Sequence, residues 1–328
     1  MTTIKNPKTG TPEILDKLRS WYKAIVVTTP GEDQEATTRP VSVREKASLD
    51  LPLKLGMVIP GGYDFYTVSD EIYSTPLSRV YLGGSKIQGK PVAIKEYRED
   101  TPSLFFERER YAQKVFSATD GHENILPAYE FLYFEGRQLG VFPYVIGGTL
   151  EDIIRREQKL TPQQAAPFVV SLCDALEYVH THGIVHRDVK PSNVLVPAET
   201  KKSFLFDFGV CWHSNLAHLD TQGHTVGTPY YMAPEAILAK TPAKEIDMYA
   251  LGILVYRMLA GRTPFIERKN INKLFLQHFQ EPIPDLTQFN PLVTKDLQFM
   301  VGKALAKDPE ERYHHAGEFK QAWLAVVG

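Results

Sequence analysis

The sequence predicts an α+β fold in which a small sheet-rich lobe precedes a large helical lobe. Runs of residues with strand preference occur in the first part of the chain, at residues 63–68, 79–82 and 91–97. A helix is predicted after them, at residues 103–117, with more strand near Phe131 and Val141. Beyond Gly147-Gly148 the chain becomes mostly helical. Strands therefore gather before the helices rather than alternating with them.

The longest predicted helix of the second part runs from Thr161 to His182, and both of its ends are marked. Thr161-Pro162-Gln163-Gln164 is a capping start, in which a threonine precedes the first turn and a glutamine follows three residues later. Gly183 is a typical stop, because glycine adopts the left-handed backbone that ends a helix.

An extension precedes the two lobes. A helix is predicted at residues 11–25, where Ile14, Leu18, Trp21 and Ile25 recur at helical spacing, and an acidic, Thr-rich linker follows it. This helix docks on the rest of the chain, binds a partner or mediates self-association; the sequence leaves the three alternatives open. We divide the chain into an extension at residues 1–60, a small lobe at 61–145 and a large lobe at 146–328.

Composition excludes several classes of protein. The formal net charge of −2 over 328 residues gives no electrostatic footprint for nucleic acid. The start lacks the apolar stretch of a signal peptide, and no run of about 18 apolar residues predicts a membrane span. The only two cysteines, Cys173 and Cys211, sit in different motifs. We therefore expect a cytoplasmic protein without disulfides. The oligomeric state is not indicated.

Two polar strings carry the chemistry. The first runs from His186 to Asn193 and reads His-Arg-Asp-Val-Lys-Pro-Ser-Asn. Asp207-Phe208-Gly209 begins fourteen residues after that asparagine. An Asp, a Lys and an Asn on one loop, followed by a second Asp, form a set of groups for moving a phosphoryl group. The strings resemble the catalytic and Asp-Phe-Gly loops of eukaryotic-type (Hanks-type) protein kinases, and the chain resembles a soluble bacterial member.

The resemblance implies the two-lobed protein-kinase fold, with a five-stranded small-lobe sheet and one helix beside it. It also implies roles for the two strings. Asp188 is expected to accept or orient the proton of the attacking hydroxyl, and Lys190 to steady the moving phosphoryl group. Asn193 and Asp207 are expected to ligate Mg²⁺, with Mn²⁺ as a substitute, on the ATP phosphates.

Val92-Ala93-Ile94-Lys95 resembles the strand whose lysine holds the α- and β-phosphates of ATP. That lysine needs an anion to fix it, and Glu109 falls where the family's pairing glutamate lies. Glu107 is the rival, but two residues along a helix place it on roughly the opposite face. Gln113 takes a position that usually carries an apolar residue, which makes this helix a candidate for regulation.

Other positions indicate a protein serine/threonine kinase. Lys190, two residues after Asp188, resembles that class, and so does the stretch Gly227 to Glu235, in which Thr228 is expected to lie near Asp188 and seat the substrate. Three structural positions are implied as well: a pair between Glu235 and Arg312, and Asp247 holding the backbone of the catalytic loop. The expected adenine site is lined by Val80, Ala93, Phe142, Tyr144, Val145 and Leu195.

The chain departs from the family at the loop that covers the phosphates. Counting back fifteen residues from Lys95 to Val80 registers this loop as Tyr73 to Val80, with Leu77 and Ser78 expected among the residues that bind the nucleotide. Its three glycines are replaced by Tyr73, Thr75 and Ser78, although backbone that approaches phosphate closely usually requires glycine. We expect weakened or unusually posed ATP. The alternative is a pseudokinase or a weak ATP-binding scaffold.

Phosphorylation sites are expected on the chain itself. Arg187 precedes Asp188, as in kinases whose activation segment is ordered by a phosphate. Thr225, three residues before Thr228, ranks first as the phosphorylated residue, followed by Thr221. In the extension, Thr37 and Thr38 resemble acidic Thr-Thr segments that a phosphothreonine-binding domain recognises. The other expected partners are proteins with serine or threonine acceptors.

Overall fold

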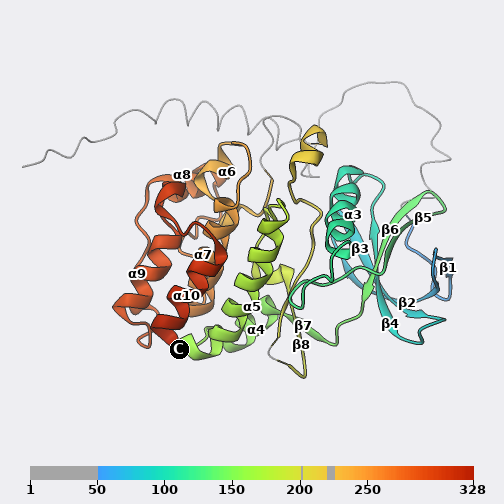
Figure 1. The fold of residues 1–328 in the computed structure, drawn as a ribbon, viewed down its shortest axis with the longest axis horizontal. Coiled ribbons are helices and arrows are strands. Elements are labelled where there is room, and N and C mark those ends of the chain that lie inside the picture. Colours follow the sequence, from blue (N-terminus) through green and yellow to red (C-terminus); the bar gives the residue numbers. More distant parts are fainter. Residues whose placement is uncertain (1–50, 201, 220–225) are drawn as a thin grey trace, which may run out of the picture.

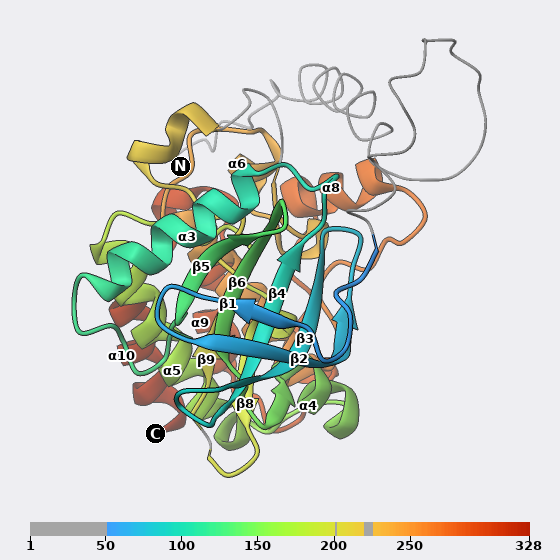
Figure 2. The same cartoon turned by 90° about the vertical axis from the view of Figure 1, so that its right-hand side faces the viewer.

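The computed structural model describes residues 51–200, 202–219 and 226–328, and these form two lobes (Figure 1). The small lobe holds a six-stranded antiparallel sheet in the order β1-β2-β3-β4-β6-β5 and the helix α3 (Leu104–Ser117). Its strands are β1 (Val58–Pro60), β2 (Phe65–Ser74), β3 (Ser78–Ser85), β4 (Pro91–Tyr97), β5 (Glu130–Phe134) and β6 (Arg137–Pro143). Figure 2 shows this sheet in front of the large lobe, with α3 beside it.

The large lobe is mostly helical, as the sequence predicts. Its helices are α4 (Leu150–Glu157), α5 (Pro162–Thr181), α6 (Pro234–Ile237), α7 (Glu245–Ala260), α8 (Ile271–Gln280), α9 (Lys295–Ala304) and α10 (Ala316–Val327). A three-stranded sheet of β7 (Gly147–Thr149), β8 (Val194–Pro197) and β9 (Phe204–Leu205) begins this lobe. Short 3₁₀ turns lie at Pro191–Asn193, Ser214–Leu219, Pro229–Tyr231, Leu286–Gln288 and Pro309–Glu311.

The strand predicted at residues 91–97 is confirmed as β4, whose side chains alternate in burial. Val92 and Ile94 are fully buried in the small-lobe core, whereas Ala93 and Lys95 are only half-buried, because successive residues of a strand point to opposite faces. β3 pairs with β4 through Val80 and Lys95. This register sets Lys95 beside the strand that carries the expected roof of the adenine site.

The small-lobe sheet has one strand more than the five expected. The additional strand, β1, pairs with β2 and buries Ile59 completely. Leu53 also packs into this core and donates its N–H to the Tyr81 hydroxyl. The sheet therefore begins before residue 61, where the sequence placed the start of the lobe. A three-residue strand is too short to show a period of two, which explains why the sequence did not reveal it.

The predicted helix at residues 103–117 is confirmed as α3, which buries one face. Phe106, Glu109, Gln113 and Phe116 recur at spacings of three and four residues, and all four are buried. Two of the four are polar. This face therefore does more than pack against the core: its polar residues, Glu109 and Gln113, make the hydrogen bonds described in the next section.

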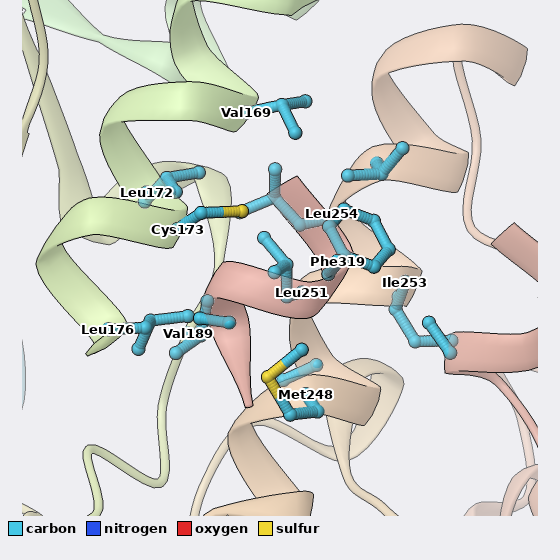
Figure 3. Close-up of a cluster of buried hydrophobic side chains, with 14 of the residues drawn as sticks. Val169, Leu172, Cys173, Leu176, Val189, Met248, Leu251, Ile253, Leu254 and Phe319 are labelled. Carbon is cyan, nitrogen blue, oxygen red and sulfur yellow. The ribbon is translucent and has the colours of Figure 1, made fainter. Parts of the chain in front are cut away.

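The core of the large lobe lies between α5, α7 and α10. Thr161 and Gln164 form the predicted capping box at the start of α5, and Gly183 follows its end with φ +69°. α7 is apolar on nearly all sides, as expected for a helix buried all round. Figure 3 shows Cys173 of α5, Leu254 of α7 and Phe319 of α10 in this cluster. Among the described residues, no helix combines the length and apolarity needed to cross a bilayer.

Both cysteines are fully buried, which predicts their reactivity. Burial raises the pKa of the Cys173 thiol, and burial likewise raises the pKa of Cys211 to about 12. Since the thiolate is the nucleophile, the raised pKa values leave very little of either cysteine in its reactive form at pH 8. Iodoacetamide at pH 8 is therefore expected to label neither cysteine in the native chain and both in guanidinium, as mass spectrometry would show. Labelling of native Cys211 alone would contradict its burial.

Candidate active site

A half-buried lysine joins the small lobe to the large one. The Nζ atom of Lys95 on β4 lies 2.7 Å from Oε2 of Glu109 on α3 and 2.8 Å from Oδ1 of Asp207, just beyond β9. The structure thus places Glu109 at Lys95. Glu107 instead binds Arg110 and the Tyr133 hydroxyl at the surface.

The charges of this cluster support one another. Burial alone would lower the pKa of Lys95, but the carboxylates of Asp207 and Glu109 outweigh it and raise that pKa above its ordinary value. Burial would raise the pKa of Asp207, yet the charge and hydrogen bond of Lys95 hold it below the ordinary value. Lys95 is therefore protonated and Asp207 ionised at neutral pH.

Tyr97 is a member of this cluster that the sequence did not reveal. Its hydroxyl donates to Oε2 of Glu109, the oxygen that also binds Lys95. The backbone N–H of Phe208 donates to the other oxygen of Glu109 at 3.3 Å. The Lys95 ammonium lies 4.9 Å from the Tyr97 ring centroid, in cation–π contact. A tyrosine in a strand is an ordinary residue, so only the fold shows that this one binds a carboxylate.

Gln113 fixes α3 one turn after Glu109, on the same buried face of the helix. Its Nε2 donates to the carbonyl of Leu126 at 3.0 Å, and its Oε1 accepts from the N–H of Ala128 at 3.0 Å. Both ends of the buried amide are thus satisfied by backbone that precedes β5. The polar residue at this position ties α3 down in this structure, whereas the sequence pointed only to a candidate for regulation.

The catalytic loop brings four expected residues together. Asp188 accepts from the Thr228 hydroxyl at 2.6 Å and lies 2.6 Å from the Lys190 ammonium. Lys190 also donates to Thr228 at 2.8 Å, and the Asn193 amide donates to Asp188 at 2.9 Å. The acidic group is therefore surrounded by donors from both its own loop and the stretch after residue 226.

Asp247 of α7 holds the backbone of this loop in place. Its carboxylate accepts the backbone N–H groups of His186 and Arg187, each at 2.8 Å, and lies 2.8 Å from Nε2 of His180. Burial would raise the pKa of Asp247, but the hydrogen bond and charge of His180 lower it. Arg187 has φ +66°, a strained backbone that the Asp247 contacts help to maintain. The sequence did not single out His180, because near Thr181 and His182 it resembles an ordinary helix end.

Phe208 connects the Asp-Phe-Gly string to α3. Its ring is fully buried, with its centroid 5.0 Å from that of Phe116 and 4.8 Å from that of His186. Asp207 has φ +65°, and this backbone turn sends Phe208 into the core while Asp207 stays at Lys95. The positions of Asp207 and of α3 are thus linked through a single peptide.

The arginine before Asp188 is engaged with the chain that follows the Asp-Phe-Gly string. Arg187 donates from Nε to the carbonyl of Val210 at 2.6 Å and from Nη2 to that of Cys211 at 3.2 Å. Its guanidinium therefore contacts the stretch from Asp207 to Glu235 that carries the predicted phosphorylation sites, the activation segment. Thr221 and Thr225 lie outside the described residues, as do Thr37, Thr38 and the predicted helix at 11–25.

The structural positions also meet as expected. The Arg312 guanidinium binds both carboxylate oxygens of Glu235, at 2.6 and 2.9 Å, in a buried bidentate pair. It also donates to the carbonyls of Ala306 and Glu245. This pair anchors α6, which follows the stretch bearing Thr228.

The residues expected to line the adenine site come from both lobes. Ala93 of β4 pairs with Phe142 of β6, which is 6% exposed and packs edge-on against Phe131. The other members are half-buried rather than sealed into either core, namely Val80, Ala93, Tyr144, Val145 and Leu195. Half-exposed apolar side chains are what a ligand would complete.

Asn193 and Asp207 fit a hard divalent cation. Asn193 uses its amide nitrogen on the carbonyl and carboxylate of Asp188, so its amide oxygen is the atom left for a ligand. The Asp207 side chain, 39% exposed, binds Lys95 through Oδ1 alone. Amide and carboxylate oxygens are preferred by magnesium. Among the described residues there is no group of three His, Cys, Asp or Glu side chains that could hold a metal ion.

The Tyr97 contact predicts a stability difference. Tyr97→Phe removes one donor from the buried Glu109 carboxylate, and a hydrogen bond to a charged group contributes about 1.5–3 kcal/mol. We expect the free energy of unfolding, measured by guanidinium titration, to fall by that amount. Tyr133→Phe is the matched control. Its hydroxyl binds the Glu107 carboxylate, but Tyr133 itself is 60% exposed, so loss of this bond leaves a group that water can reach. Equal losses in the two variants would contradict a special role for Tyr97.

Comparisons with known proteins agree with this geometry. A family model described as "Protein kinase domain" matches residues 66–324. The serine/threonine-protein kinase PknB of Mycobacterium leprae is 32% identical over 272 residues, which cover 80% of this chain and 43% of the relative. The serine/threonine-protein kinase PrkC of Bacillus subtilis is 30% identical over 268 residues, covering 81% of this chain and 40% of the relative. The chain thus spans less than half the length of these relatives. On the match and the assembled site together, the chain belongs to the protein kinase domain family.

Proposed function

We propose that this chain transfers the γ-phosphoryl group of ATP to serine or threonine hydroxyls of proteins. The observation that carries the proposal is the arrangement at Asp188, which meets Lys190, Thr228 and Asn193 within hydrogen-bond distance. The relatives named above are serine/threonine-protein kinases by name, and the same class is assigned here on the Lys190 and Thr228 positions.

The proposed mechanism rests on positioning and charge. Asp188 orients the acceptor hydroxyl and receives its proton, while Lys190 neutralises charge on the transferred group. Lys95, held by Glu109, binds the α- and β-phosphates. A divalent ion, Mg²⁺ in our proposal, would be held by Asn193 and Asp207 and would neutralise charge on the phosphates.

Substrate and nucleotide would bind on different residues of the site. Thr228 bonds to Asp188 and Lys190 at once, and in this proposal the acceptor hydroxyl would lie beside the stretch that Thr228 begins. This contact supports a peptide substrate seated at Thr228. Adenine would contact Val80 and Ala93 above and Leu195 below, with Tyr144 and Val145 offering backbone groups. Phe142 would limit the depth of this site.

Transfer is tested directly with labelled ATP. The wild-type chain is expected to label casein on serine or threonine in the presence of Mg²⁺, and Asp188→Asn or Asp207→Asn to lower the rate by at least about a hundredfold. Asp174→Asn is the control, because its pair with Lys320 lies on α5 and α10 away from the site. Uptake of Mg-ATP without any transfer by the wild type would instead identify a pseudokinase scaffold.

Regulation by self-phosphorylation is part of the proposal. Arg187 contacts the activation segment at Val210 and Cys211, so a phosphate on that segment would meet a guanidinium already placed there. We propose Thr225 first and Thr221 second as its sites. Thr37 and Thr38 would serve as a phosphorylated motif for a phosphothreonine-binding partner.

Phosphosite mapping separates these proposals. After incubation with Mg-ATP, the wild type is expected to carry phosphate at Thr225 or Thr221, and Asp188→Asn to carry none. Modification of Thr37 or Thr38 would support the partner motif. An unmodified activation segment in a chain that labels casein would remove the regulatory proposal and leave the activity standing.

A further inference from the structure

The turn between β2 and β3 has already satisfied its own backbone donors. Thr75 Oγ1 accepts the N–H of Leu77 at 3.2 Å and that of Ser78 at 3.0 Å. The N–H of Thr75 donates to the carbonyl of Ser78 at 2.8 Å, and Pro76 has no N–H to offer. From residue 75 to residue 78, each donor of the backbone is thus engaged within the turn.

The same turn is fastened from outside. The carbonyl of Leu77 accepts the N–H of Arg98 at 3.0 Å and the hydroxyl of Thr101 at 2.6 Å. The Arg98 guanidinium donates to the Ser74 hydroxyl at 2.9 Å. Arg98 and Thr101 lie in the connection from β4 to α3. The tip of the hairpin is therefore tied to the chain that leads into the helix of Glu109.

These bonds matter for nucleotide binding because of where the turn lies. Val80 pairs with Lys95, and the hairpin continues from Val80 toward its tip at Leu77. The turn is thus the segment that registers with the phosphate-covering loop of the family. A donor that must first leave Thr75 gains little from binding phosphate, because the new bond replaces an existing one.

We propose that Thr75 sets the nucleotide affinity of this site by occupying the two amides that would otherwise bind phosphate. The triphosphate is then held from the side of Lys95 and the cation at Asn193 and Asp207, without donors from the turn. This inference rests on the proposed function, since it concerns the same nucleotide.

Calorimetry on the full chain tests the proposal with Mg-ATP and with adenosine. Thr75→Ala removes the acceptor and frees the amides of Leu77 and Ser78. Its Kd for Mg-ATP is expected to fall on the order of tenfold, from one or two new bonds to a charged phosphate, while its Kd for adenosine stays unchanged. Thr75→Ser keeps the acceptor oxygen and is expected to match the wild type with both ligands.

The outcomes separate this inference from the proposed function. Equal or weaker Mg-ATP binding by Thr75→Ala, with adenosine binding intact, overturns the role of Thr75 and leaves the kinase proposal untouched. If the wild type binds Mg-ATP but transfers no phosphate, the kinase proposal is overturned. The Mg-ATP affinity of Thr75→Ala still tests the role of Thr75 in that case.

Amide hydrogen exchange of the wild type gives a second, mutation-free measurement. The amides of Leu77 and Ser78 are expected to exchange at the same rate with and without Mg-ATP, because their partner is Thr75 in both states. Marked slowing of these two amides on addition of Mg-ATP would show that they bind phosphate, which contradicts the proposal.

Discussion

The buried carboxylate of Glu109 is the group on which the rest of the site depends. It accepts from Lys95 and Tyr97 of β4 and from the backbone of Phe208, so one side chain of α3 positions two other segments. A buried carboxylate with fewer donors would be costly, because its charge has little water around it. The strand β4, the helix α3 and the Asp-Phe-Gly string are consequently favoured in one mutual arrangement. Lys95 and Asp207 take their places within it.

Much of this arrangement was predictable from the sequence because most of the site residues lie in short, continuous sequence motifs. Asp188, Lys190, Asn193 and Asp207 stand in short motifs; in the structure the first three meet one another, and Asp207 meets Lys95. The β4 strand and the α5 helix were predictable for a different reason. Residues of high strand preference mark β4, and a capping box followed by a glycine stop marks α5.

The remainder depends on contacts between distant segments, which local patterns do not record. Tyr97 and His180 stand in an ordinary strand and an ordinary helix, and only the fold brings them to Glu109 and Asp247. Thr75 was noticeable as a missing glycine, but its hydrogen bonds to Leu77 and Ser78 depend on the conformation of the turn. The short strand β1 was missed because three residues show no periodicity.

The Gln113 amide bears on which small molecules this protein will accept. A compound that binds by pushing α3 outward has to break two buried bonds to the backbone at Leu126 and Ala128. Leaving those groups without partners carries a desolvation penalty of about 1–3 kcal/mol for each one. The site should therefore bind compact inhibitors that leave α3 in place more tightly than inhibitors that need α3 to move outward.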